Sequence, residues 1–275
     1  MKKNAFLVAS AVVCASASLF ADNVQGDNVF GVLPVLSKAA DTIVAVPWCA
    51  CSAADDQPIA ISNIVKTANL TVGDKVYVLS GSGNSTVYNT WELVEGAGNV
   101  LYWQSVTTAT ASEVKPSQSA DAATAARGTA IRLHRQNPTN GVDAVAFYLF
   151  GQVGTQSEIT TTIANGTSQA PAYTLIAPPG ADSVNLLLNS QLTNCSNGDE
   201  IVVRGANGAN KAYFYESSEA KWKTVSRTFP GGVETLETNA VNNITLQAGL
   251  GAWYISRGAA PTLEWKNVTI KSNVE

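Results

Sequence analysis

The stretch Asn69-Leu-Thr-Val-Gly73-Asp74-Lys-Val76-Tyr-Val78 has a later partner, Asn194-Cys-Ser-Asn-Gly198-Asp199-Glu-Ile201-Val-Val203. In both stretches a Gly-Asp pair precedes a segment in which every second residue is aliphatic. Alternation with a period of two is typical of a β-strand, and glycine reaches the positive φ of a tight turn without steric cost. The two stretches therefore predict the same turn and strand twice, which indicates an internal repeat.

The features that follow these stretches also recur in the same order. Each stretch precedes a Gly/Asn/Ser turn cluster, an aromatic segment and a strand with a tryptophan, which is Trp103 in the first half and Trp222 in the second. Ile131–Arg135 then matches Trp253–Arg257. This alignment puts Arg135 and Arg257 at the same place, where each forms an ion pair at the end of its strand or the two form a polar binding pair.

Upstream, Asp41–Pro47 matches Asp182–Leu188, but the spacing to the Gly-Asp turn differs. Asp41 lies 32 residues before Gly73, and Asp182 lies 16 residues before Gly198. The first half is therefore expected to hold 16 additional residues, among them Cys49 and Cys51. Such an insertion is either a candidate site or an ordinary difference in loop length.

Short alternating segments separated by glycine-containing turns predict an all-β fold. We expect two tandem related β-sandwich or barrel-like domains from an internal duplication, at residues 22–160 and 161–275, after a signal peptide at 1–21. Thr160–Ala172, rich in Thr, Asn, Gly and Ser, is the expected joint. The one helix-like stretch is alanine-rich and covers residues 117–127, between Pro116 and Gly128.

The N-terminus predicts export. Met1-Lys-Lys-Asn4 is a positive n-region, and Ala5–Ala15 is an apolar segment with the length of a signal-peptide h-region, too short and too interrupted by serines for a membrane anchor. Cleavage follows Ala17 or Ala21. We expect a protein of the periplasm, the outer cell surface or the extracellular space, with no transmembrane span after signal removal.

Composition narrows the function classes. The chain has 17 Lys and Arg against 21 Asp and Glu, a net charge of −4, which removes the basic footprint of a nucleic-acid binder. A single histidine, His134, argues against multi-histidine metal sites and leaves little material for Ser-His-Asp chemistry. His134 alternates with Leu133 and lies between Arg132 and Arg135, so we expect it at an exposed strand position. A general base would need an orienting acid and a nucleophile, and neither is evident. No cofactor, metal site or catalytic residue is predicted.

Three cysteines remain after signal removal, and export permits a disulfide. We expect Cys195 to bridge with Cys49 or Cys51, which leaves one thiol over. A metal site is the alternative, but three cysteines without a neighbouring histidine fall short of a closed tetrahedral zinc site.

Acidic residues have two interpretations. Asp74 and Asp199 are expected to cap the amides of their turns, with calcium binding or acid–base chemistry as the alternative. Asp55 and Asp56, inside the insertion, are the better calcium candidates, but two carboxylates supply only part of a calcium shell.

The six tryptophans either pack in a sandwich core or stack on sugar rings. Trp91, near a loop, and Trp48, beside the cysteine insertion, are the candidates for glycan contact.

The signal sequence, the Leu-x-x-Gly-Asp-x-Val-x-Val strand, the tryptophan strand and the late strand before Phe150-Gly-Gln-Val153 resemble a large family of secreted β-rich paralogues of verrucomicrobia and related bacteria. The resemblance implies an exported envelope or extracellular protein and transfers no catalytic residues. The second half departs from the pattern, because it ends in Leu263-Glu-Trp265-Lys.

These observations favour an exported, non-enzymatic structural or adhesive component of the cell envelope or extracellular matrix. Its expected partners are other envelope proteins or glycans. The alternative is a carbohydrate-binding module that uses exposed tryptophans.

Overall fold

The computed structural model describes residues 30–36, 41–50, 57–60, 70–80, 87–99, 101–106, 124–136, 145–154, 156, 158–180, 182–204, 209–228, 235–258 and 261–266. Within these residues the fold is all-β, and its one helix is the single turn α2 (Leu186–Asn189). The predicted signal peptide, Cys51, Asp55, Asp56 and the first part of the predicted helix lie outside the described residues.

The first large sheet has five antiparallel strands in the order β2-β8-β4-β5-β6. Its strands are β2 (Asp41–Ala45), β8 (Ala130–His134), β4 (Lys75–Ser80), β5 (Val87–Glu95) and β6 (Leu101–Ser105). The Gly-Asp turn at Gly73 and Asp74 leads directly into β4, as the sequence predicts.

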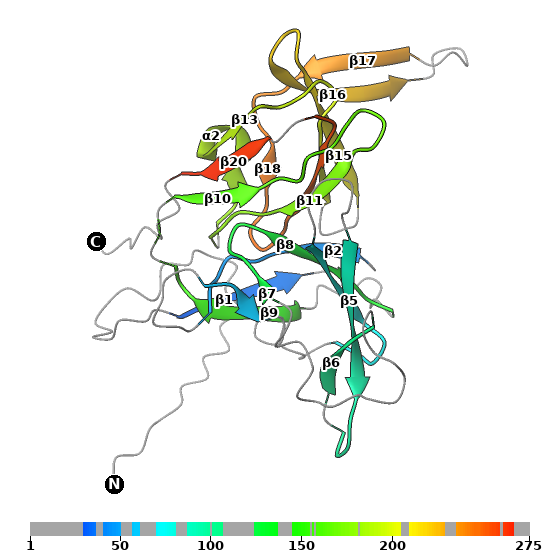
Figure 1. Cartoon of the computed structure of the whole chain (residues 1–275), viewed down its shortest axis with the longest axis vertical. Coiled ribbons are helices and arrows are strands. Elements are labelled where there is room, and N and C mark those ends of the chain that lie inside the picture. Colours follow the sequence, from blue (N-terminus) through cyan, green and yellow to red (C-terminus); the bar gives the residue numbers. More distant parts are fainter. Residues whose placement is uncertain are drawn as a thin grey trace.

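The second large sheet has six antiparallel strands in the order β11-β19-β14-β15-β16-β17. They are β11 (Ala172–Ile176), β19 (Ala252–Ser256), β14 (Glu200–Arg204), β15 (Asn210–Glu216), β16 (Lys221–Thr228) and β17 (Thr235–Ala240). From β11 to β16 the five neighbouring strands have the same connectivity as β2, β8, β4, β5 and β6 in the first sheet. The halves occupy opposite ends of the long axis, with β5 and β6 at one end and β16 and β17 at the other (Figure 1).

Shorter pairings accompany each large sheet. In the first half, β1 (Phe30–Leu36) pairs with β9 (Val145–Gln152), and β3 (Ile59–Ala60) pairs with β7 (Thr124–Ala125). In the second half, β12 (Val184–Asn185) pairs with β18 (Thr245–Leu246), and β20 (Thr262–Trp265) lies between β10 (Ile159–Thr162) and β13 (Ser190–Thr193). The expected joint therefore begins inside a strand, because β10 belongs to the second half by its pairing.

The alanine-rich stretch does not continue as a helix to Arg127. Thr124 and Ala125 form β7, in register with Ala60 and Ile59. Ala125 is buried in the first core, and Gly128 takes a φ of 84° in the turn that follows. Burial of Ala125 against another strand overrides the helix propensity of alanine, which is a weak preference.

The strand registers define which residues of the two halves hold the same position, and we call these residues counterparts. Asp41, His134, Lys75 and Glu92 pair in one row of the first sheet. The same row of the second sheet holds Tyr173, Ile255, Glu200 and Phe214.

Two details of the sequence alignment are wrong in the light of these registers. The counterpart of Asp41 is Tyr173, and Asp182–Leu188 instead leads into β12 and α2. Tyr173 lies 25 residues before Gly198, so the first half holds 7 additional residues there and not 16. Both errors arise because apolar runs look alike, while main-chain pairing fixes the register.

Each half has its own hydrophobic core with matching positions. Val76, Trp91 and Trp103 in the first core are counterparts of Ile201, Tyr213 and Trp222 in the second. The equivalence of the two tryptophan strands was predicted from the sequence.

The halves are joined by two reciprocal contacts between a strand and a turn. Val44 of β2 forms a bridge with Leu250, and Ile176 of β11 forms one with Thr129. The amide of Ala45 donates to Gly249 O at 3.0 Å, and the amide of Ala177 donates to Gly128 O at 3.2 Å. A third apolar cluster lies between the halves and consists of Ile43, Ala45, Ala130, Leu175 and Ala177. In each half, the strand at the edge of the large sheet, β2 or β11, therefore forms backbone hydrogen bonds with a turn of the other half.

Candidate functional site

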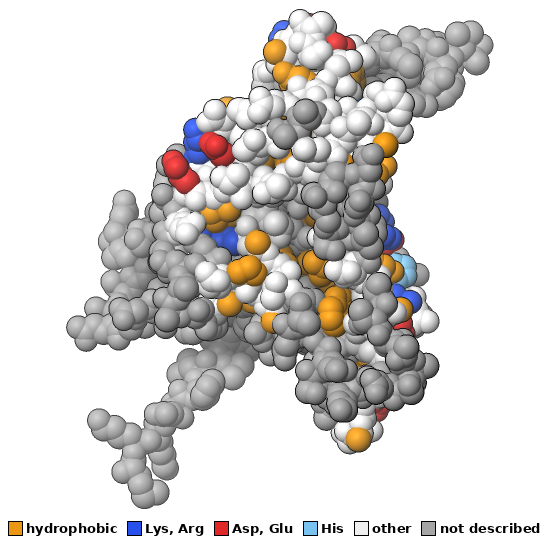
Figure 2. Space-filling view, in the orientation of Figure 1, with side chains coloured by type: hydrophobic (Ala, Val, Ile, Leu, Met, Phe, Trp, Pro, Cys, Tyr) orange, Lys and Arg blue, Asp and Glu red, His pale blue; other side chains and the backbone are white. Residues whose placement is uncertain are grey.

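The open face of the first sheet carries a charged cluster around Asp41. Alternation along β8 buries Ile131 and Leu133 and turns Arg132 and His134 to the opposite face. There His134 Nδ1 donates to Asp41 Oδ1 at 3.0 Å, and Arg132 Nη2 lies 2.8 Å from the same oxygen. Figure 2 shows the histidine, in pale blue, beside basic and acidic side chains on one flank of the molecule.

These contacts fix the ionisation of Asp41. Burial acts to raise its pKa, but the hydrogen bonds from His134 and Arg132 outweigh burial and lower the pKa below its usual range. Arg132 also lies over the ring of Tyr77, 5.0 Å from the centroid. Lys75 and Glu92 extend the row as an ion pair at 3.5 Å.

Sequence reasoning did not find this cluster. The sequence predicts a solvent-facing His134 and names no orienting acid, but the side chain is 37% exposed and pairs with Asp41, which lies 93 positions away in the chain. Only the pairing of β2 with β8 brings the two residues opposite each other. Asp41, the first residue of β2, is a polar residue that could have indicated a charged partner, but no local pattern shows which strand lies beside β2.

The same face of the second sheet carries aromatic and aliphatic side chains at the positions of the charged cluster, with Glu200 and its ion pair to Arg257 farther along the row. The counterparts of Asp41, Arg132 and His134 are Tyr173, Trp253 and Ile255. Tyr173 is 42% exposed, and its ring meets that of Trp253 edge to face, with 6.1 Å between centroids. The two halves thus carry different chemistry on equivalent faces.

The tryptophans predicted to contact glycans are buried. Trp48 and Trp91 are 5% and 6% exposed and belong to the first core. Trp91 lies on β5, where alternation turns its ring to the inner face, and Trp48 precedes Cys49, which bridges to Gln152 of β9. Neither ring is presented to a ligand.

The repeated aspartates are turn caps, as the sequence predicts. Asp74 accepts from the amides of Thr71 at 3.0 Å and Gln136 at 2.8 Å. Asp199 accepts from the amides of Ser196 at 2.9 Å and Arg257 at 2.6 Å. Both carboxylates are buried, so these bonds replace lost hydration.

The same bonds correct the arginine alignment. Gln136 and Arg257 are counterparts because their amides bind the equivalent carboxylates, so Arg135 corresponds to Ser256. Arg135 is buried, whereas Arg257 is half-exposed and pairs with Glu200 at 2.6 Å. The two arginines therefore do not form a repeated site.

The predicted disulfide is absent between the described cysteines. Cys195 is an unbridged thiol next to Asp199 and Tyr254, and Cys49 is a buried thiol whose Sγ donates to Gln152 O at 3.2 Å. Cys195 is the counterpart of Leu70 and packs against the second core as Leu70 packs in the first. Its role in the fold is that of a small apolar side chain packed against the second core.

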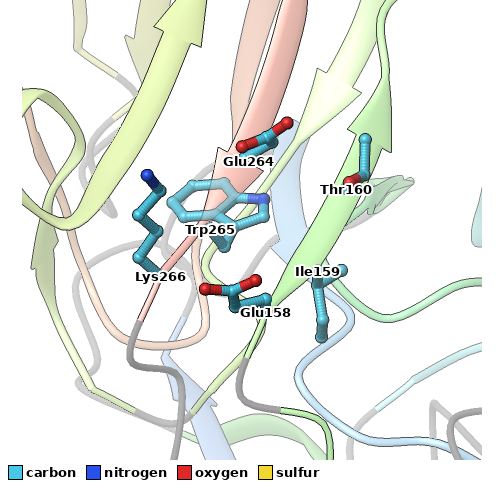
Figure 3. Close-up of a pocket in the computed structure, with 6 residues that line it drawn as sticks. All are labelled: Glu158, Ile159, Thr160, Glu264, Trp265 and Lys266. Atoms are coloured by element: carbon cyan, nitrogen blue, oxygen red, sulfur yellow. The ribbon is translucent and has the colours of Figure 1, made fainter.

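A small pocket of about 140 Å³ lies between β10 and β20. Figure 3 shows Glu158 and Glu264 on either side of Trp265, with Lys266 beyond the ring. Trp265 is 1% exposed and donates its indole N–H to Thr161 Oγ1 at 3.0 Å. The pocket therefore offers charged side chains but little aromatic surface.

In the described part of the chain, no three His, Cys, Asp or Glu side chains are grouped to hold a metal ion. No helix among the described residues has the length and apolar character needed to cross a membrane.

Comparisons of the chain with protein-family models, with curated proteins and with solved structures found no match.

Proposed function

We propose that the chain is an exported, non-enzymatic structural or adhesive component of the cell envelope or extracellular matrix. The observation that carries this proposal is the reciprocal joining of the halves, in which β2 and β11 each bond to a turn of the other half. A shared apolar cluster between the sheets makes the two halves one body. Such a body keeps two large sheet faces at a fixed angle, which suits a scaffold or an adhesion module.

We also propose that the two halves are related domains produced by duplication. The common strand order supports this, as do the hydrogen bonds of the two Gly-Asp turns. Gly73 and Gly198 donate to Leu93 O and Tyr215 O at 2.9 Å in each case. Two unrelated sheets of similar topology would not be expected to share the same hydrogen bonds in their turns and the same core positions.

Export rests on the N-terminal sequence and is tested by fractionation. The full chain with a C-terminal tag, made in a Gram-negative host, should leave the cytoplasm and begin at Ser18 or Asp22 by N-terminal sequencing. A chain that lacks residues 2–21 is the control and should stay in the cytoplasm. Full-length protein with its N-terminus intact in the cytoplasm would overturn the proposed location.

The adhesive role is tested with the purified mature chain. It should sediment with isolated envelope fragments, and the bound amount should saturate. A chain that stays in the supernatant and also fails to self-associate would contradict a structural or adhesive role.

Glycan binding is a second candidate, favoured by the exposed Tyr173 and its contact with Trp253. Aromatic rings on an open sheet face offer apolar surface to the C–H face of a sugar. Trp253→Ala should abolish retardation of the protein in gels that contain envelope polysaccharide. Arg132→Ala, at the counterpart position, is the matched control and should leave retardation unchanged. Equal retardation of both variants would contradict this candidate.

A further inference from the structure

Each half contributes one strand and one turn to the surface between the halves, and the strand and turn of one half are counterparts of those of the other. β2 and the turn at 126–129 come from the first half, and β11 and the turn at 247–250 come from the second. We call these four segments the inter-half patch. Ile43 and Leu175, and likewise Ala45 and Ala177, are counterparts within its apolar cluster. A patch built in this way is close to self-complementary, as in a two-fold symmetric dimer.

One pair of counterparts breaks the symmetry. Ala130 faces Gly251, and a Cβ placed on Gly251 would lie 2.7 Å from Ala130 Cβ and 2.8 Å from Ile176 O. Two first halves would bring one Ala130 against another in that crowded place. The patch of a first half therefore fits the patch of a second half and rejects another first half.

A buried arginine adds to this selectivity. Arg127 is 5% exposed, and its Nε donates to Pro179 O at 2.7 Å across the patch. Its counterpart in the second half is Ala248, which has no such donor. Thr161 Oγ1 also donates to Gly128 O at 3.0 Å. These bonds form where a first half meets a second half, and the loss of one removes a hydrogen bond in a buried place.

The connection between the two halves of one chain is short, which favours pairing of these two halves over pairing with another chain. β9 ends at Gln152 and β10 begins at Ile159, so few residues join the halves. A short tether gives a high effective concentration, of the order of the millimolar range, which favours pairing within one chain. Between chains the same contacts form when the local protein concentration approaches that range.

We propose that the inter-half patch also joins separate copies of this chain, with the first half of one copy bound to the second half of another. The result is an exchanged dimer, or a longer chain when the ends do not close. The proposal deepens the structural role proposed above and rests on it for its biological setting. The occupant is a second copy because exchange continues an interface that the single chain already makes.

The test uses two full-length single variants, Val44→Cys and Leu250→Cys, because these residues are bridge partners. Mixed at concentrations up to about 1 mM, the two variants should form a disulfide-linked dimer on a non-reducing gel, since only exchange brings position 44 of one chain to position 250 of another. The dimer fraction should rise with concentration. Mixing Val44→Cys with Thr238→Cys, on the exposed β17, is the control for random collisions.

The double variant Val44→Cys/Leu250→Cys in one chain separates the possible failures. If it forms an internal disulfide while the mixed single variants stay monomeric at every concentration, the patch is correct and exchange is refuted. If neither experiment gives a cross-link, the patch itself is wrong. Failure of export in the fractionation experiment affects the proposed location only, and leaves the outcome of the cross-linking experiment intact.

Discussion

At the scale of single residues, Asp41 shows how one carboxylate responds to its neighbours. It accepts from both His134 and Arg132, and its pKa is lowered by these bonds in spite of partial burial. A carboxylate with a lowered folded-state pKa contributes stability that is present above the unfolded-state pKa. This contribution is lost as the pH falls through the folded-state pKa.

Asp41→Asn should therefore lower the free energy of unfolding at pH 7 by about 0.5–1 kcal/mol, the range of a partly exposed ion pair. The difference from the unmodified protein should disappear below the lowered pKa, where Asp41 is protonated. Urea unfolding at several pH values measures this. Glu95→Gln, at an exposed position, is the control and should show no such trend. A difference that stays constant into acid would show that packing and not charge is responsible.

Cys195 illustrates the effect of burial on a thiol. Removal from water raises its pKa to about 11, although a hydrogen bond with Tyr254 opposes the shift. The thiolate is the reactive species, so a raised pKa suppresses alkylation at neutral pH.

In native protein, iodoacetamide at pH 8 should alkylate Cys195 about a hundredfold more slowly than in urea-unfolded protein, because the thiolate fraction is smaller by that factor. Peptide mass spectrometry follows this cysteine separately from the others. The native rate should increase up to about pH 11. A native rate at pH 8 equal to the unfolded one would contradict the burial of this thiol.

At the scale of elements, the Gly-Asp turn is the unit that fixes β4 and β14. Asp74 and Asp199 each satisfy two backbone amides, one from their own turn and one from the segment after β8 or β19. Asp199 has one more partner, because Tyr254 donates its hydroxyl to Oδ2 at 2.7 Å. The position of Tyr254 is held by Leu133 in the first half.

Asp74→Ala should lower the free energy of unfolding by about 2–4 kcal/mol, since it removes two part-buried hydrogen bonds to a charged carboxylate. Asp199→Ala should cost about 1–2 kcal/mol more, because the hydroxyl of Tyr254 also loses its acceptor. Tyr254→Phe keeps the caps of Asp199 and removes the hydroxyl with its bonds to Asp199 and Cys195, so it should account for most of that difference. Equal losses for the two aspartate variants would refute the added role of Tyr254. Denaturant unfolding measures all three variants.

At the scale of the whole molecule, the contact of Gly251 with Ala130 controls how closely the halves approach. An alanine at 251 would meet a rigid Cβ and a backbone carbonyl oxygen, neither of which can move alone. Overpacking of this kind typically costs about 1–3 kcal/mol.

Gly251→Ala should therefore lower the free energy of unfolding by about 1–3 kcal/mol. Adding Ala130→Gly should recover part of the loss, with a coupling of at least about 0.5 kcal/mol in a double-mutant cycle. Ala248→Ser is the control, because Ala248 lies in the same turn at an exposed position, and it should be nearly neutral. Strict additivity of the two substitutions would show that the residues do not meet.

Local sequence determined the elements of this protein. The period-two alternation predicted β4 and β14, the Gly-Asp pairs predicted their turns and caps, and Trp103 and Trp222 marked equivalent strands. These features depend on neighbours within a few residues, so they can be read without knowing what lies across the sheet.

Tertiary structure alone decided which of these residues meet. Asp41 faces His134, and Trp48 and Trp91 are buried while Trp253 is half-buried on the opposite face of its sheet, because strand pairing sets the face to which each side chain points. Matching Arg135 with Arg257 shifts the alignment of the two halves by one residue, and a shift of one residue moves every side chain to the other face of the sheet. The two arginines therefore look equivalent in the sequence and are not equivalent in the structure. The union of the halves through Ala130 and Gly251 depends on a contact between residues 121 positions apart, which main-chain bonds and close packing fix and no local pattern encodes.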